Sequence, residues 1–209
     1  MKKQVIIFDF DGTLADVLPA FKEIYQELAP KYGLKIIDDD DYLKLRQQPI
    51  WKIMWKIGLK PWRLEGLLKD GRRLFANKKA EVNLFDGIAD LIKKLDHDGH
   101  KLYILSSNRE RTIRLILERY GLNEEVVIMK RPSFFGKSSS IKKLIKHHNY
   151  KRSDVWMIGD EVRDLKGGKG AKVNTISVSW GLQGREILSR NNPDYLADKV
   201  KEIEDIFKN

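Results

Sequence analysis

The sequence of 209 residues contains no cysteine, which excludes disulfide bonds and thiolate chemistry and favours an intracellular, cytoplasmic setting. It also lacks any apolar run near the roughly 20 residues that a membrane-spanning helix needs. An early apolar stretch at residues 5–8 is interrupted by Asp9 and Asp11, too soon for the apolar region of a signal peptide. We therefore expect a protein that works without a membrane and without disulfides.

Acidic residues are fewer than basic ones, since 30 Asp and Glu stand against 40 Lys and Arg for a net charge of +10. Such an excess can indicate nucleic acid, acidic lipid or small anionic partners. The basic residues are spread along the chain, mostly on expected solvent faces of helices, and no recognisable nucleic-acid motif accompanies them. We interpret the charge as a solvated basic surface. The sequence indicates no oligomeric state.

Five short apolar segments are predicted to be strands. Most lack the polar and apolar alternation of a half-exposed strand, so they are expected to be covered on both faces. Helical patterns separate them, and this order predicts an α/β fold with a doubly wound parallel five-stranded sheet. The expected strands are residues 5–10, 102–106, 126–129, 155–158 and 175–178, and the expected helices 88–95, 110–120, 138–147, 164–170 and 199–207.

Residues 16–82 interrupt this order, because they contain no convincing strand and show helical periodicity instead. Ile24 and Leu28, for example, lie on one helical stripe. We predict a small α-helical cap domain, residues 16–82, inserted into a core of residues 1–15 and 83–209. Because the insertion leaves the core directly after the first strand, we expect it to act as a mobile lid.

The strongest chemical signal follows the first predicted strand, where Asp9 and Asp11 precede Gly12 and Thr13. Side chains two apart in an extended segment lie on the same side, so both carboxylates converge where open α/β sheets bind ligands. Two close carboxylates repel each other, so the pattern demands a cation, and oxygen ligands suit Mg²⁺. One carboxylate can then attack phosphorus while the other protonates the leaving oxygen. An apolar strand directly before these acids disfavours the alternative, a turn with surface acids.

Two later segments offer groups that bind phosphate. Ser106, Ser107 and Asn108 end the second predicted strand, where hydroxyl and backbone N–H groups can hold phosphate oxygens. Small polar residues there can equally begin the next helix. Lys137 lies near the start of a predicted helix, where a cation opposes the helix dipole. Its position favours an anionic partner over an ordinary surface lysine.

Acids also follow the fourth predicted strand. Asp160 comes at the strand's end and can meet a metal directly, or it can begin the next helix. Asp164 comes four residues later, where it can orient a metal ligand from behind. Glu161 is interpreted as a solvated acid.

In this order and spacing, the four segments resemble the haloacid dehalogenase superfamily, in its phosphoglycolate phosphatase-like branch with a helical cap. The resemblance implies a Rossmann-like core and a Mg²⁺-dependent phosphatase that hydrolyses a small phosphorylated metabolite through an aspartyl-phosphate. The second acid favours phosphate esters, because dehalogenases lack it. The implied roles are Asp9 as nucleophile; Asp11 as acid/base; Gly12, Thr13, Ser107, Asn108 and Lys137 as phosphate ligands; Asp9, the main-chain carbonyl of Asp11, and Asp160 as metal ligands; and Asp164 as their support.

Two features depart from the family pattern. The phosphate lysine usually precedes a proline, and Lys137 does not, so Lys130, which lies closer to one, is the alternative. We favour Lys137 because it directly precedes the helix that leads to the fourth strand. The helix after Asp164 contains Gly167 and Gly168 where the family usually has alanine. Each glycine costs a helix about 1 kcal/mol relative to alanine, so we expect local looseness there.

Trp51, Trp55 and Trp62, with neighbouring lysines and Arg46, give the predicted cap an aromatic and cationic character. Trp51 and Trp55 share a helix face because they are four residues apart. We expect these indoles to pack in the cap's own core. The alternative is that they contact the organic part of a substrate, which the sequence does not name.

Two other functions remain open. A phosphosugar mutase of the same family would differ only in the group that accepts the phosphoryl from Asp9. A basic nucleic-acid-binding protein with a relic site is disfavoured, because Asp9, Asp11 and Asp160 are all present.

Overall fold

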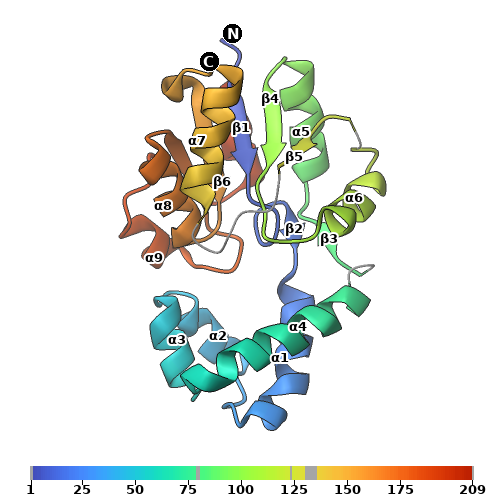
Figure 1. Cartoon of the computed structure of the whole chain (residues 1–209), viewed down its shortest axis with the longest axis vertical. Helices are drawn as coiled ribbons and strands as arrows, with labels where there is room; N and C mark the ends of the chain where they lie inside the picture. Colours follow the sequence, from blue (N-terminus) through green and yellow to red (C-terminus); the bar gives the residue numbers. More distant parts are fainter. Residues whose placement is uncertain (1, 79–80, 123, 130–135, 209) are drawn as a thin grey trace.

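The computed structural model describes residues 2–78, 81–122, 124–129 and 136–208. A six-stranded sheet with helices on both faces forms one part of the molecule, and four helices form a layer beyond the end to which β1 points (Figure 1). The strand order is β5-β4-β1-β6-β7-β8 and every described neighbour pair is parallel. The strands are β1 Val5–Phe8, β4 Lys101–Ile104, β5 Val127–Ile128, β6 Val155–Gly159, β7 Asn174–Val178 and β8 Tyr195–Ala197.

The predicted α/β fold with a parallel sheet is confirmed, but the predicted number of five strands is wrong. The described part of the sheet has a sixth strand, β8, which pairs with β7. It spans three residues, of which Ala197 alone is buried. A strand so short leaves no apolar run in the sequence, so β8 is defined by its partner rather than by its own composition.

Both faces of the sheet are covered, which explains why β1 is wholly apolar. Ile6 and Phe8 point into one core cluster, and Val5 and Ile7 point into the other. Helices α5, α6 and α10 supply the first cluster, and α7 and α8 supply the second. These helices are α5 Ile88–His97, α6 Glu110–Glu118, α7 Lys137–His148, α8 Val162–Ala171 and α10 Val200–Phe207, close to the predicted ranges; a further short helix, α9 Arg185–Ser189, was not predicted.

Four helices lie between two short antiparallel strands, β2 Ala15–Asp16 and β3 Asn83–Leu84. Because β2 pairs with β3, the chain leaves and re-enters the sheet side of the molecule at one place (Figure 1). The helices have a separate small core that includes Leu45 and Ile57. We name them the cap helices: α1 Leu18–Tyr32, α2 Asp39–Leu45, α3 Ile50–Lys56 and α4 Leu64–Lys78, with the 3₁₀ turn Pro61–Arg63 before α4. Among the described residues, no helix has the length and apolar character to cross a membrane.

The expectation that the cap indoles pack in the core of the cap helices is wrong. Trp51, Trp55 and Trp62 are 64%, 79% and 76% exposed. Ile53 and Ile57 occupy the inward face of this segment instead. Residues four apart share a helix face, so a helix that turns Ile53 and Ile57 inward carries Trp51 and Trp55 together on a different, outer face.

Candidate active site

The topology brings the predicted motifs to one edge of the sheet. Strand β1 lies between β4 and β6, with Phe8 opposite Ile104 on one side and Ile158 on the other. The residues that follow these three positions therefore meet at the carboxyl ends of neighbouring strands. Because the chain order reverses between β1 and β6, this is also the place where open α/β sheets bind ligands.

Asp9 is buried at this edge and faces Lys137. The Lys137 ammonium lies 2.8 Å from Asp9 Oδ2, and both side chains are less than one-tenth exposed. Lys137 is the first residue of α7 and also pairs with Asp164. Burial alone would lower the pKa of Lys137, but the carboxylates of Asp164 and Asp9 outweigh it and hold that pKa above its ordinary value. The lysine is therefore a permanent cation beside Asp9.

Asp9 belongs to a cluster of three buried carboxylates, and two of them, Asp9 and Asp164, pair with Lys137. Oxygens of Asp9, Asp160 and Asp164 lie within 4.8 Å of one another. Asp9 Oδ1 accepts a hydrogen bond from the N–H of Phe10 at 2.8 Å, whereas the buried Oδ2 accepts no well-aligned hydrogen bond from the described residues. An oxygen without such a donor, beside other buried carboxylates, fits a hard divalent cation, for which Mg²⁺ is the common choice.

Asp11 lies on the same turn but has different partners. Asn108 donates its side-chain N–H to Asp11 Oδ1 at 2.9 Å, and the Ser106 hydroxyl lies 3.5 Å from Oδ2. Burial, followed by the negative charge of Asp9, raises the pKa of Asp11 to about 6. A carboxyl group with that pKa can give and take a proton near neutral pH. Ser107, the predicted phosphate ligand, is partly exposed, and its hydroxyl makes no hydrogen bond within the described residues.

A model of the haloacid dehalogenase-like hydrolase family matches residues 6–178. The chain belongs to this family. A phosphoglycolate phosphatase from Synechococcus elongatus is 33% identical over 201 residues, covering 96% of this chain and 95% of that protein. Pyrophosphatase PpaX from Halalkalibacterium halodurans is 26% identical, covering 99% and 97%. A haloacid dehalogenase-like protein from Streptococcus pneumoniae has the same fold, with a TM-score of 0.81, 21% identity and 99% of each chain covered. This haloacid dehalogenase-like hydrolase is therefore a phosphatase.

Asp160 in this hydrolase is held from two sides. Thr13 donates its hydroxyl to Asp160 Oδ1 at 2.8 Å, and the N–H of Leu182 donates to Oδ2 at 2.7 Å. Burial, with the like charges of Glu161 and other nearby acids, raises the pKa of Asp160 well above its ordinary value. Bringing a cation to this carboxylate would offset the cost of keeping it ionised and buried.

Asp164 lies in the same cluster of buried carboxylates as Asp9 and Asp160. One of its oxygens pairs with Lys137, and the other accepts the N–H of Glu161 at 3.0 Å. Burial raises the pKa of Asp164 to about 7, against the opposing effect of Lys137. The interpretation of Glu161 as a solvated acid is wrong, because its side chain is only 20% exposed and pairs with Arg163 at 2.6 Å.

Gly12 and Thr13 both contact Asp160, and their predicted role in phosphate binding stays a prediction. Their N–H groups already donate to the carbonyls of Ala15 and Phe10. Gly12 has a φ of +81°, and a Cβ there would lie 2.3 Å from Asp160 Oδ2. A glycine is required because Asp160 occupies the space of a side chain, and the Thr13 hydroxyl is committed to the same carboxylate. Both residues therefore place Asp160.

The glycines of α8 pack closely rather than loosening the helix. A Cβ on Gly167 would lie 2.8 Å from the Cβ of Lys137, and one on Gly168 would lie 2.6 Å from Cγ2 of Thr175. These contacts let α7 and β7 approach α8 at the depth of the site. The expected looseness is wrong here because each missing methyl group is replaced by a neighbouring residue. Lys130, the alternative phosphate lysine, lies outside the described residues.

Sequence reasoning missed the loop that follows β7. Residues 179–184, named here the β7 loop, supply the Leu182 N–H that holds Asp160. The Trp180 indole N–H also donates to the carbonyl of Thr13 at 3.1 Å. Backbone donors carry no signature in the sequence, so only the glycine at position 181 gave a hint of close approach. A Cβ there would lie 2.2 Å from the carbonyl oxygen of Gly12.

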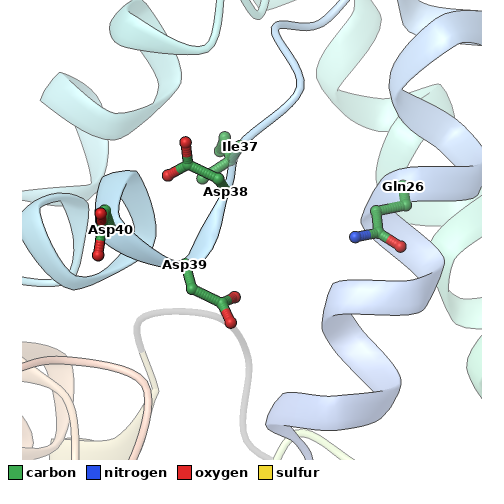
Figure 2. A pocket seen from close by; sticks show the side chains of 5 residues that line it. All are labelled: Gln26, Ile37, Asp38, Asp39 and Asp40. Carbon is green, nitrogen blue, oxygen red and sulfur yellow. The ribbon is translucent and has the colours of Figure 1, made fainter.

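A hollow among the cap helices lies apart from this site. Figure 2 shows its lining, with Asp38, Asp39 and Asp40 around the start of α2 and Gln26 on α1. Asp38 accepts the N–H of Asp41 at 2.7 Å, and Asp39 pairs with Lys22. Acids at a helix N-terminus stabilise the helix through its dipole, so these side chains serve α2 itself.

Proposed function

We propose that this phosphatase hydrolyses a small phosphorylated metabolite, such as phosphoglycolate, by Mg²⁺-dependent transfer of the phosphoryl group to Asp9. The observation that carries the proposal is the buried Asp9 carboxylate with the Lys137 ammonium 2.8 Å away. A carboxylate attacking phosphorus needs the phosphate's charge neutralised, and Lys137 supplies a fixed positive charge beside it. The name of the Synechococcus elongatus relative supports phosphoglycolate as the first substrate to test.

Two carboxyl groups divide the chemistry. In the first step an oxygen of Asp9 forms a bond to phosphorus, the bond from phosphorus to the leaving oxygen breaks, and Asp11 gives that oxygen its proton. In the second step Asp11 takes a proton from water, the water oxygen bonds to phosphorus, and the Asp9–phosphorus bond breaks. Inorganic phosphate leaves and both carboxyl groups return to their starting states. The raised pKa of Asp11, about 6, suits both of its proton transfers.

Groups from the turn after β4 and from the start of α7 would hold the transferred phosphoryl group. Lys137 offers an ammonium from the start of α7, and Ser107 offers a partly exposed hydroxyl after β4. Asn108 lies in the same turn, and its amide also fixes Asp11. These groups contact oxygens of the phosphate rather than the organic part, so they favour phosphate esters without choosing among them.

The cation would be held by Asp9, Asp160 and the main-chain carbonyl of Asp11, with Asp164 orienting the cluster. Mg²⁺ at this position supplies positive charge between the carboxylates and the phosphate oxygens. Oxygen ligands favour Mg²⁺ over zinc, and the sequence has no cysteine to offer as an alternative. The raised pKa values of Asp160 and Asp164 reflect buried negative charge that such a cation would balance.

We also propose that residues 16–82 form a cap domain that closes over the site during transfer and opens for water and product. The pairing of Ala15 with Leu84 supports this, because both connections pass through one narrow place. The exposed indoles of Trp51 and Trp55 are then available to touch the organic part of a substrate.

The test is a panel of phosphorylated metabolites, including phosphoglycolate and pyrophosphate, assayed for phosphate release with Mg²⁺ and with chelator. The Asp9→Asn variant is the blank for contaminating phosphatases. We expect release that depends on Mg²⁺, is lost on chelation and returns when Mg²⁺ is restored. Turnover that survives exhaustive chelation would contradict the metal-dependent mechanism. Isomerised sugar phosphate without net phosphate release would instead identify a mutase.

A further inference from the structure

Arg46, which directly follows α2 of the cap helices, forms hydrogen bonds to the β7 loop. Its Nη2 donates to the carbonyls of Ser179 at 2.8 Å and Gly181 at 2.6 Å, with Gln183 at 3.4 Å. In return, the N–H of Gly184 donates to the main-chain carbonyl of Arg46 at 2.9 Å. Hydrogen bonds from a guanidinium are stronger than neutral ones, so this is a substantial connection between the two parts of the molecule.

The next residue continues the same contact. Gln47 accepts the N–H of Glu186 through its side-chain oxygen at 3.0 Å. A Cβ on Gly184 would lie 2.1 Å from Gln47 Nε2, so a side chain at position 184 would have to displace the end of the Gln47 side chain. The turn after α2 therefore fits closely over the end of the β7 loop.

The β7 loop also forms a hydrogen bond to Asp160, a proposed metal ligand. The Leu182 N–H, between two of the carbonyls that Arg46 binds, donates to Asp160 Oδ2 at 2.7 Å. The Gln183 side-chain oxygen accepts the N–H of Val162, just after Asp160, at 2.6 Å. The loop thus holds Asp160 from one side while Arg46 holds the loop from the other.

We propose that Arg46 is a positioning residue, which fixes the orientation of Asp160 through the β7 loop and thereby couples docking of the cap helices to metal binding. This inference rests on the proposed function for the metal, but it concerns a residue that touches neither metal nor phosphate. If docking improves the metal site, metal binding must favour docking to the same extent, because coupling between two equilibria is reciprocal. The cap helices then influence the chemistry without supplying a reacting group.

A purely structural role for Arg46 predicts something different. An arginine that only attached the cap helices would change stability, while Mg²⁺ affinity would be unaffected by its removal. Arg63 provides a matched control, because it also donates to a backbone carbonyl, that of Tyr32 at 2.7 Å, but within the cap helices. Arg63→Ala loses the same kind of bond without touching the β7 loop.

The experiment is a calorimetric titration with Mg²⁺ alone, without substrate, on the wild type and on Arg46→Ala, Arg46→Lys and Arg63→Ala. Circular dichroism and thermal unfolding establish that each variant is folded. We expect Arg46→Ala to bind Mg²⁺ about tenfold more weakly, a loss of about 1.4 kcal/mol. Arg46→Lys should recover part of the affinity, since an ammonium can reach one carbonyl, and Arg63→Ala should bind like the wild type.

Hydrogen exchange measures the reciprocal effect. In the wild type, Mg²⁺ should slow exchange at the amides of Gly184 and Glu186, which donate to Arg46 and Gln47. In Arg46→Ala this protection should largely vanish at saturating Mg²⁺. Equal Mg²⁺ affinity in Arg46→Ala and the wild type would overturn the inference and leave the proposed function standing. Equal losses in Arg46→Ala and Arg63→Ala would overturn it too, and a wild type that binds no Mg²⁺ would overturn both.

Discussion

The active site and the cap helices differ sharply in what they bury. At the site, Asp9, Lys137, Asp160 and Asp164 are charged groups no more than 6% exposed. In the cap, neither α3 nor α4 has a single fully buried residue, and large indoles face solvent. Buried charges need fixed partners on every side, whereas a thin core with exposed side chains tolerates movement and replacement. Under the proposed function, the chemistry belongs to the part with buried charges, and the cap helices are the place where substrate selection would vary.

The cap helices and the sheet side of the molecule contribute different kinds of groups to the contact between them. The side chains of Arg46 and Gln47 bind main-chain atoms of the β7 loop and of α9, respectively. The loop in turn holds Asp160 through a main-chain N–H. The sheet side of the molecule thus contributes backbone groups to this connection, whereas the cap helices contribute the side chains of two particular residues.

The largest expected effect comes from Asp9→Asn, which alters the chemistry and leaves both parts folded. A neutral amide cannot form the acyl phosphate, so turnover should fall to the background level. Phosphate-release kinetics measure the loss, and circular dichroism checks the fold. Substantial hydrolysis by a folded, pure Asp9→Asn protein would remove Asp9 from its proposed role.

Asp11→Asn should come next, and its effect should depend on the substrate. With an alkyl phosphate the rate should fall about 10²- to 10⁴-fold, the usual worth of general acid/base catalysis. With an aryl phosphate the loss in the first step should be smaller, because that leaving oxygen needs less help from an acid. Comparing kcat for the two substrate types measures this. An equal loss for both would argue against proton transfer by Asp11 to the leaving group.

A pair of substitutions in α3 and just after it tests the contrast between buried and exposed residues of the cap. Ile57→Ala should destabilise the protein by about 2–5 kcal/mol, because Ile57 is buried in the small core. Trp55→Ala should change stability by less than about 0.5 kcal/mol, because the indole is 79% exposed. Urea unfolding provides both values. A large loss in Trp55→Ala would mean that the indole has a packing role after all.

The smallest expected effect is a change in stability, tested by replacing one glycine in the cap helices and one in α8 with alanine. Gly71 lies inside α4, where a Cβ would meet only Leu28 at 4.0 Å. Gly71→Ala should therefore stabilise the protein by up to about 1 kcal/mol, the difference in helix propensity. Gly167→Ala should instead reduce both stability and turnover, because its Cβ would displace Lys137. Thermal unfolding and kcat distinguish the two. A Gly167→Ala protein with unchanged kcat would show that Lys137 tolerates a shift.

The sequence alone determined the features that depend on short stretches of chain. An apolar strand that ends in Asp9 and Asp11, and another that ends in Asp160, predict both the sheet and the edge where ligands bind. Asp164 follows Asp160 by one helical turn, so its place close to Asp160 was predictable from spacing, and its supporting role stays a prediction. The helices of the cap were predictable for the same reason, since periodicity is a local property.

Tertiary structure alone decided the features that join distant segments. Thr13 and Asp160 are 147 positions apart, and nothing in either segment predicts that the Thr13 hydroxyl donates to the Asp160 carboxylate. Gly12 is glycine because of that same carboxylate, and β8 exists because β7 offers it an edge. In the sequence Arg46 is one of many basic residues, and only the structure shows that it donates to three main-chain carbonyls. Sequence patterns record the periodicity and chemistry of side chains, whereas these contacts depend on close approach and on backbone groups that every residue carries.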